Sequence, residues 1–205
     1  MVLKTFFIGL DGHKYIVGDS ILVHPPAGNQ PYVAKIEQIS SRKANGSSVI
    51  TISWYYRPEE AHGGRKSYHG RDELFPSDHY DDINVQSVEG PCRVLTRGEY
   101  TEATEQVANG LKEDDGIPCF YTCVEYKAAK RAFHPDRIDV YCCCNMPYNP
   151  DLDMIQCTCC EDFFHAACIG ATNEELPYLS NLGFVCMECA MAKEAAGALP
   201  GTYRK

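Results

Sequence analysis

Cysteine and histidine residues near the C-terminus form a series whose types and spacing suit metal binding. Nine of the 12 cysteines in this 205-residue chain lie between Cys142 and Cys189, mostly in close pairs. A short loop can point both side chains of such a pair at one ion. The expected ligands are Cys142, Cys144, Cys157, Cys160, His165, Cys168, Cys186 and Cys189. Eight ligands predict two closed zinc sites, which support folding and leave no open position for catalysis.

Disulfide or redox chemistry is the alternative for these cysteines. A disulfide scaffold spreads its cysteines along a chain, whereas clustered pairs beside a histidine are typical of metal binding. Cys143 and Cys159 are surplus to the series, so a shift of the ligand register by one residue stays open. Cys119 and Cys123 have no companion histidine and form a weaker metal candidate.

Aromatic residues on two predicted strands form a second candidate site. The segment 32–39 alternates apolar and polar residues, and 49–57, rich in β-branched and aromatic residues, predicts the longest strand. Trp54 and Tyr56 lie two residues apart, so they share one face of their strand, and Tyr32 can join them across the sheet. The alternative is that Trp54, the only tryptophan, belongs to the core.

The elements that must position these residues are mainly β up to about residue 139. Asp11 and Gly12 suit the tight turn of a hairpin between residues 5–10 and 13–17. A short helix is expected over 101–109. Further strands, which would complete a twisted barrel or sandwich, are expected at 21–24, 32–39, 49–57, 93–95 and 120–126.

Composition and charge exclude several classes of function. Hydrophobic residues make up 44% and charged residues 23%, as in an ordinary globular protein. No apolar run approaches the length of a membrane helix, and the chain is expected not to be exported. The net charge is −9, and residues 141–189 contain seven acidic residues and no lysine or arginine. This acidity suits a basic partner and does not indicate sequence-specific nucleic acid binding.

No catalytic set emerges from the sequence. His165 is an expected zinc ligand and is therefore not available as a catalytic base. No serine or cysteine nucleophile has a recognisable base beside it. No glycine-rich segment has the spacing that cradles phosphate. We therefore expect a protein that is not an enzyme.

The order and spacing of the zinc series resemble a PHD (plant homeodomain) finger. That resemblance implies a cross-brace, with Cys142, Cys144, His165 and Cys168 on one ion and the other four cysteines on the second. It also implies a methyl-lysine cage at four positions, which here are Tyr141, Tyr148, Met154 and Phe163. The family commonly has tryptophan at the position of Phe163. Peptide contacts are implied at Asp151 and Asp153.

Two alternatives remain for this zinc module. The same order of cysteines and histidine occurs in some RING-type ubiquitin ligases. The aromatic side chains, for their part, can serve only to pack a small zinc fold.

The first part of the chain resembles a BAH (bromo-adjacent homology) domain over about residues 16–138. The matching segments are WYYRPEE, ELFPSDH and EGPCRV, and AFHPDRIDVYC follows at the junction with the zinc module. A BAH domain directly followed by a PHD finger resembles plant chromatin readers. In these, Tyr32, Trp54 and Tyr56 would form a cage for trimethyl-lysine 27 of histone H3, and a loop containing His79 and Asp81 would contact the peptide. Arg57, Glu59 and Glu60 are predicted to form a structural polar cluster.

The sequence thus predicts a mainly β protein, with a BAH-type twisted β-barrel followed by a small cross-brace PHD finger that binds two structural zinc ions. We expect the BAH domain at 1–138, the finger at 139–190 and a loose tail at 191–205. The expected function is nuclear reading of methylated histone H3 tails, lysine 27 by the BAH pocket and di- or trimethyl-lysine 4 by the PHD pocket, together with chromatin-associated complexes. The alternatives are a ubiquitin ligase and an interaction scaffold with degenerate pockets.

Overall fold

The computed structural model describes residues 2–3, 5–25, 28–41 and 48–195. The chain divides into two compact units, residues 1–137 and 138–205. Among the described residues, no helix is both long and apolar enough to cross a membrane.

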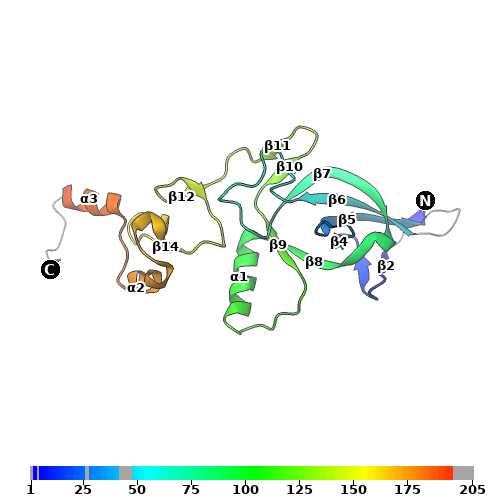
Figure 1. The fold of residues 1–205 in the computed structure, drawn as a ribbon, viewed down its shortest axis with the longest axis horizontal. Coiled ribbons are helices and arrows are strands. Elements are labelled where there is room, and N and C mark those ends of the chain that lie inside the picture. Colours follow the sequence, from blue (N-terminus) through cyan, green and yellow to red (C-terminus); the bar gives the residue numbers. More distant parts are fainter. Residues whose placement is uncertain (1, 4, 26–27, 42–47, 196–205) are drawn as a thin grey trace. The chain divides into compact units, whose positions relative to one another are not determined.

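Six strands in the described part of the first unit close into a barrel (Figure 1). Around the barrel the order is β5, β4, β8, β9, β7 and β6, and β6 pairs with β5 to complete the circle. The pairs that β9 makes with β7 and β8 are parallel, and the others are antiparallel. The barrel strands are β4 (Ser20–Val23), β5 (Tyr32–Ser41), β6 (Ser48–Tyr56), β7 (Glu73–Asn84), β8 (Val88–Thr96) and β9 (Cys119–Thr122). The predicted mainly β barrel is confirmed.

Smaller elements surround the barrel. The hairpin of β2 and β3 is present, and its connection runs over residues 9–13. It is therefore longer than the tight turn expected at Asp11 and Gly12. These elements are β1 (Val2–Leu3), β2 (Phe6–Ile8), β3 (Lys14–Ile16), η1 (Val85–Ser87), α1 (Arg97–Ala108), β10 (Glu125–Lys127) and β11 (Ala132–His134).

Alternating aliphatic side chains of the strands fill the barrel. Ile36, Ile50 and Ile52 are fully buried, and Ile21 of β4 joins the same cluster. Burying one such side chain contributes about 1.5–3 kcal/mol. Trp54 packs against the edge of this cluster while remaining partly exposed. The core therefore fixes the strand that carries the candidate aromatic site.

The longest strand of the barrel is β7, not β6, and it contains the segment 79–81 that the sequence assigned to a loop. β7 pairs with β6 over most of its length, with Tyr80 opposite Ser53. Its sequence resembles a loop because it contains Pro76, followed by a run of mostly polar residues. Most of this second half of the strand is exposed in the structure. The register shifts between Ser53 and Tyr55, and such a bulge accommodates a proline in the partner strand.

Two further boundaries differ from the sequence prediction. The strand expected over 120–126 is two strands, because β9 joins the barrel between β7 and β8 while β10 pairs with β7 and β11. Helix α1 begins at Arg97, four residues earlier than expected. The side chain of Thr96 caps its N-terminus and Glu99 completes a capping box.

The described part of the second unit, residues 138–195, is a small fold with two short hairpins and three short helical segments before helix α3. Its core consists of Ile155, Ala166 and Leu176, with Phe164 and Phe184 packed against them. The elements are β12 (Val140–Tyr141), β13 (Met146–Pro147), β14 (Met154–Gln156), β15 (Phe163–His165), η2 (Ala167–Ile169), η3 (Asn173–Glu175), α2 (Leu176–Asn181) and α3 (Met187–Ala195). So few buried apolar residues favour a fold that depends on bound metal.

The tail expected at 191–205 begins as helix. Residues 191–195 belong to α3, which therefore extends past the predicted end of the finger at residue 190. Residues 196–205 lie outside the described residues.

Candidate functional site

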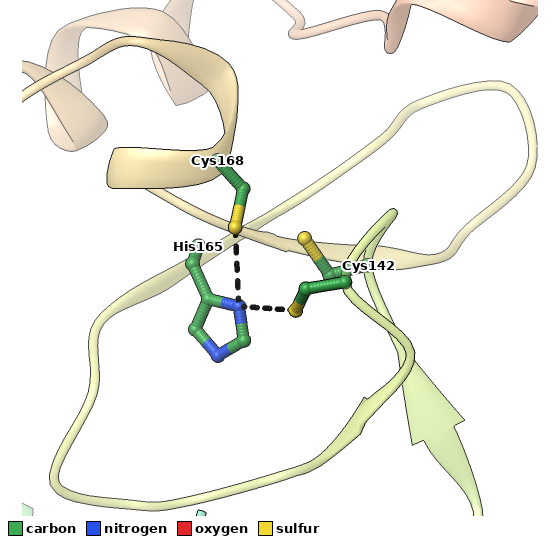
Figure 2. A group of neighbouring side chains, drawn as sticks. Cys142, His165 and Cys168 are labelled. Atoms are coloured by element: carbon green, nitrogen blue, oxygen red, sulfur yellow. Dashed lines mark hydrogen bonds between the residues drawn. The ribbon is translucent and has the colours of Figure 1, made fainter. Parts of the chain in front are cut away.

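Four ligand atoms from separate segments of the second unit meet at one point. Cys142, Cys144, His165 and Cys168 each offer one atom, and these atoms lie within 4.8 Å of one another. Nδ1 of His165 lies 3.4 Å from Sγ of Cys144 and 3.9 Å from Sγ of Cys168. Figure 2 shows Cys142, His165 and Cys168 pointing toward a common centre. In a tetrahedral zinc site, sulfur and nitrogen ligands are about 3.5 Å apart, so this donor set fits zinc.

A second group contains only cysteines. Cys157, Cys160, Cys186 and Cys189 also have their sulfur atoms within 4.8 Å of one another. Sγ of Cys160 and Sγ of Cys186 are 3.9 Å apart. Two thiolates on one tetrahedral zinc ion are about 3.8 Å apart. The two groups interleave along the chain, which is the cross-brace that the PHD resemblance implies.

Backbone amides point at the sulfur atom of Cys157. The N–H groups of Cys159 and Cys186 donate to it at 3.4 and 3.3 Å. Such hydrogen bonds stabilise a thiolate, the form that binds zinc. The surplus cysteines, Cys143 and Cys159, are exposed and lie outside both four-residue groups. The chemistry and geometry of both donor sets are therefore compatible with two structural zinc ions.

The aromatic residues of the first unit line a pocket of about 480 Å³. Tyr32, Trp54 and Tyr56 all contribute to its wall. The ring centroids of Tyr32 and Trp54 are 5.9 Å apart, and the rings meet edge to face at 74°. Two rings at this angle border the same pocket, and a cage for a quaternary ammonium group needs such neighbouring rings.

The third ring is fixed by its neighbours. The hydroxyl of Tyr56 forms a 2.8 Å hydrogen bond with Nδ1 of His79, and Tyr126 packs against the ring with centroids 5.2 Å apart. Burial raises the pKa of Tyr56, and the negative charge of Glu60 adds to this effect. The phenol therefore stays neutral near pH 7, and its orientation is set before a ligand arrives.

Two carboxylates also line the pocket, Glu60 and Asp81. Each accepts a hydrogen bond from a backbone amide, Glu60 from Arg57 at 2.7 Å and Asp81 from Asp82 at 2.8 Å. Acidic groups beside ring faces favour a cationic ligand. The structure thus brings His79 and Asp81 to the pocket with all three rings, although from strand β7 and not from a loop.

Several lining residues were not singled out in the sequence. Tyr55 lines the pocket together with Trp54 and Tyr56, although strict alternation would turn it to the other face. Its ring packs against the separate core cluster that contains Val33 and Leu74, as that alternation predicts. Val23, His24, Ile83 and Ser87 also line the pocket without having been singled out, whereas Glu60 was predicted only as part of a polar cluster.

Aromatic rings also gather in the second unit. The ring centroid of Tyr141 lies 6.4 Å from that of Tyr148 and 6.0 Å from that of Phe163, both edge to face. In the β14–β15 hairpin, Gln156 pairs with Phe163, so Met154 lies on the same face as Phe163. Tyr141 therefore contacts both Tyr148 and Phe163, and Met154 lies on the same face of its hairpin as Phe163.

The acidic residues predicted to contact a peptide precede this hairpin. Asp151 and Asp153 are both exposed. The backbone amide of Asp151 donates to the side chain of Asn149 at 2.9 Å, which fixes the turn before β14. Phe164, on the opposite face, packs against Phe184 in the core.

Comparison with known proteins matches both units. The BAH domain family matches residues 13–137, and the UBR7-like PHD finger family matches residues 138–195. Chromatin remodeling protein EBS of Arabidopsis thaliana is 47% identical over 174 residues, covering 84% of this chain and 69% of that protein. Chromatin remodeling protein SHL of the same plant is 41% identical over 174 residues, covering 84% and 72%.

A more distant relative shares one part of the chain. Nucleosome-remodeling factor subunit NURF301 of Drosophila melanogaster is 27% identical over 119 residues, which cover 58% of this chain and 4% of that protein. The BAH match spans more than half of the chain, and the two plant relatives match across both units. The chain therefore belongs to the family of BAH domain proteins in which a PHD finger directly follows the BAH domain.

Proposed function

We propose that this protein is a non-enzymatic nuclear chromatin reader that binds methylated histone H3 tails. In this proposal the pocket of Tyr32, Trp54 and Tyr56 takes trimethyl-lysine 27. The observation that carries the proposal is the convergence of these three rings, with two carboxylates, on one pocket. Ring faces bind a trimethylammonium group by cation–π attraction and dispersion, and the carboxylates favour its positive charge.

The finger supplies a second pocket in the same proposal. Tyr141, Tyr148, Met154 and Phe163 form the wall for di- or trimethyl-lysine 4, while Asp151 and Asp153 meet basic residues of the peptide. The edge-to-face contacts of Tyr141 with two other rings support this assignment. The acidity of residues 141–189 suits the basic histone tail.

Zinc has a structural role in this proposal. Cys142, Cys144, His165 and Cys168 hold one ion, and Cys157, Cys160, Cys186 and Cys189 hold the other. Each ion has four protein ligands, so neither offers an open position for substrate. The domains are assigned to residues 1–138 and 139–190, close to the two compact units.

The relatives support a chromatin-associated role. Two of them are described as chromatin remodeling proteins and a third as a subunit of a nucleosome-remodeling factor. We infer that this chain also acts at chromatin, with histone tails and chromatin-associated protein complexes as its partners.

Calorimetric titration with H3 peptides tests the proposed function. The peptides are unmodified or carry one trimethyl-lysine, at position 4 or at position 27. We expect both methylated peptides to bind more tightly than their unmodified counterparts, and to bind independently of each other. Equal binding of all peptides would instead favour an interaction scaffold with degenerate pockets.

Replacement of Phe163 tests the finger pocket separately. We expect Phe163→Trp to strengthen binding of trimethyl-lysine 4 peptide by about 0.5–1 kcal/mol, because tryptophan attracts a cation more strongly than phenylalanine does. Phe163→Ala should abolish binding while two zinc ions remain, since Phe163 is not a ligand. Tyr178→Ala removes a 66% exposed ring of α2 and serves as the matched control in the titration. No effect of Phe163→Trp or Phe163→Ala would assign these rings to packing alone.

A further inference from the structure

The polar segment after β6 was expected to be a structural cluster, and the structure separates its members. Arg57 donates through Nη2 to the carbonyl oxygen of Pro31 at 3.0 Å. Glu59 forms an ion pair with Arg65 at 2.9 Å. Arg57 and Glu59 therefore have the structural roles expected of them.

Glu60 differs from these two residues. Its side chain is exposed, and one carboxylate oxygen accepts the backbone N–H of Arg57 at 2.7 Å. Among the described residues, no lysine, arginine or histidine forms an ion pair with it. The carboxylate is thus oriented by the backbone and keeps a second oxygen for a ligand.

A second cavity adjoins the cage pocket. Its volume is about 260 Å³, and its wall shares Tyr32 and Glu60 with the cage. The other residues that line it are Asn29, Gln30, Arg57 and Glu59. The two cavities are therefore neighbours, with Tyr32 and Glu60 in the wall of each.

We propose that this second cavity is a subsite for an arginine next to the methylated lysine, and that Glu60 is the residue that selects it. The inference rests on the proposed function of the cage. Successive side chains of an extended peptide point to opposite sides, so the neighbour of a caged lysine needs a site outside the cage. A guanidinium group is planar, pairs with a carboxylate and stacks on an aromatic face. Glu60 offers the carboxylate and Tyr32 the ring.

The charges around the cavity agree with this ligand. Arg65 neutralises Glu59, and the guanidinium of Arg57 is engaged with a backbone carbonyl. Arg57 keeps its positive charge, and Glu60 is the carboxylate of this wall without an ion pair among the described residues, while the side-chain carbonyls of Asn29 and Gln30 add hydrogen-bond acceptors.

Titration with matched peptides tests the subsite. One peptide is histone H3 trimethylated at lysine 27, and the other has citrulline in place of the arginine that precedes this lysine. Citrulline keeps the shape of arginine and removes its charge. Glu60→Gln keeps an acceptor for the amide of Arg57, so the turn should be retained. Because Glu60 also lines the cage, Glu60→Gln removes one negative charge near the trimethylammonium group in both complexes. We expect it to weaken binding of the arginine peptide about two- to fivefold more than binding of the citrulline peptide.

Asp82→Asn is the control for the loss of one negative charge nearby. Asp82 accepts a hydrogen bond from Thr51 at 2.6 Å and does not line either cavity. It should weaken both peptides equally, and only slightly. The subsite is wrong if wild type binds the two trimethylated peptides with the same affinity, or if Glu60→Gln weakens both by the same factor. If wild type fails to distinguish trimethylated from unmodified peptide, the proposed function of the cage fails instead.

Discussion

Removal of zinc is expected to unfold residues 141–189 and to leave the barrel folded. The core of the second unit contains few buried apolar side chains, so its folding energy must come largely from metal binding. Structural zinc contributes about 10–16 kcal/mol in comparable small modules, which exceeds or equals the whole stability of a typical domain. Native mass spectrometry should find two zinc ions per chain. Circular dichroism should then show partial unfolding when a chelator is added.

Neighbouring cysteines provide a matched pair for this prediction. Cys160 belongs to the all-cysteine group, whereas Cys159 is exposed and lies outside it. Cys160→Ala should lose zinc and unfold the finger, and Cys159→Ala should keep two ions. Tryptophan emission reports on the barrel alone, because Trp54 is the only tryptophan in the sequence. A stoichiometry of zero or one in the wild type would contradict the ligand assignment.

Loss of the indole of Trp54 is expected to cause the largest change in peptide binding. Cation–π attraction in a desolvated cage contributes about 2 kcal/mol, so Trp54→Ala should weaken trimethyl-lysine 27 binding roughly tenfold to thirtyfold. Trp54→Phe should retain part of the affinity, because a ring face remains. Fluorescence anisotropy of a labelled peptide measures both effects.

Two controls separate binding from folding in that experiment. Trp54 packs against the barrel core, so thermal unfolding of each variant must be compared with that of the wild type. Tyr80→Ala removes a 59% exposed ring from β7 that does not line the pocket, and its affinity should be unchanged. Wild-type affinity in a folded Trp54→Ala protein would mean that the cage assignment is wrong.

Those elements of the barrel domain that the local residue pattern determines could be predicted from the sequence. Period-two alternation indicated β5, β-branched and aromatic residues indicated β6, and the spacing of Trp54 and Tyr56 placed both on one face of β6. The start of α1 also has a local signal in the sequence, because Thr96 and Glu99 have capping-box spacing.

The strand β7 was missed because its order comes from its partners. Its second half is exposed, and Pro76 interrupts the pattern that a central strand should have. Only pairing with β6 on one side and β9 on the other makes it a strand. The positions of His79 and Asp81 beside the rings follow from that pairing, which the local sequence does not encode.

The ligand series of the finger was readable from spacing, because close cysteine pairs chelate. The interleaving of the two groups is a property of the fold, and it came from the resemblance and not from the spacing itself. The position of Glu60 likewise depends on the fold and could not be predicted from the local sequence. Its neighbours in sequence, Arg57 and Glu59, are structural, and only the three-dimensional turn leaves its carboxylate in the wall of two neighbouring cavities.

Tryptophan fluorescence during peptide titration tests the central claim most directly. Because Trp54 is the only tryptophan and lines the pocket, its emission reports occupancy of that site. We expect a saturable change in emission with H3 peptide trimethylated at lysine 27, and none with the unmodified peptide. Peptide trimethylated at lysine 4 should bind without changing the emission. If trimethyl-lysine 27 peptide binds by calorimetry and leaves the emission of Trp54 unchanged, the ligand occupies another site and the cage is contradicted.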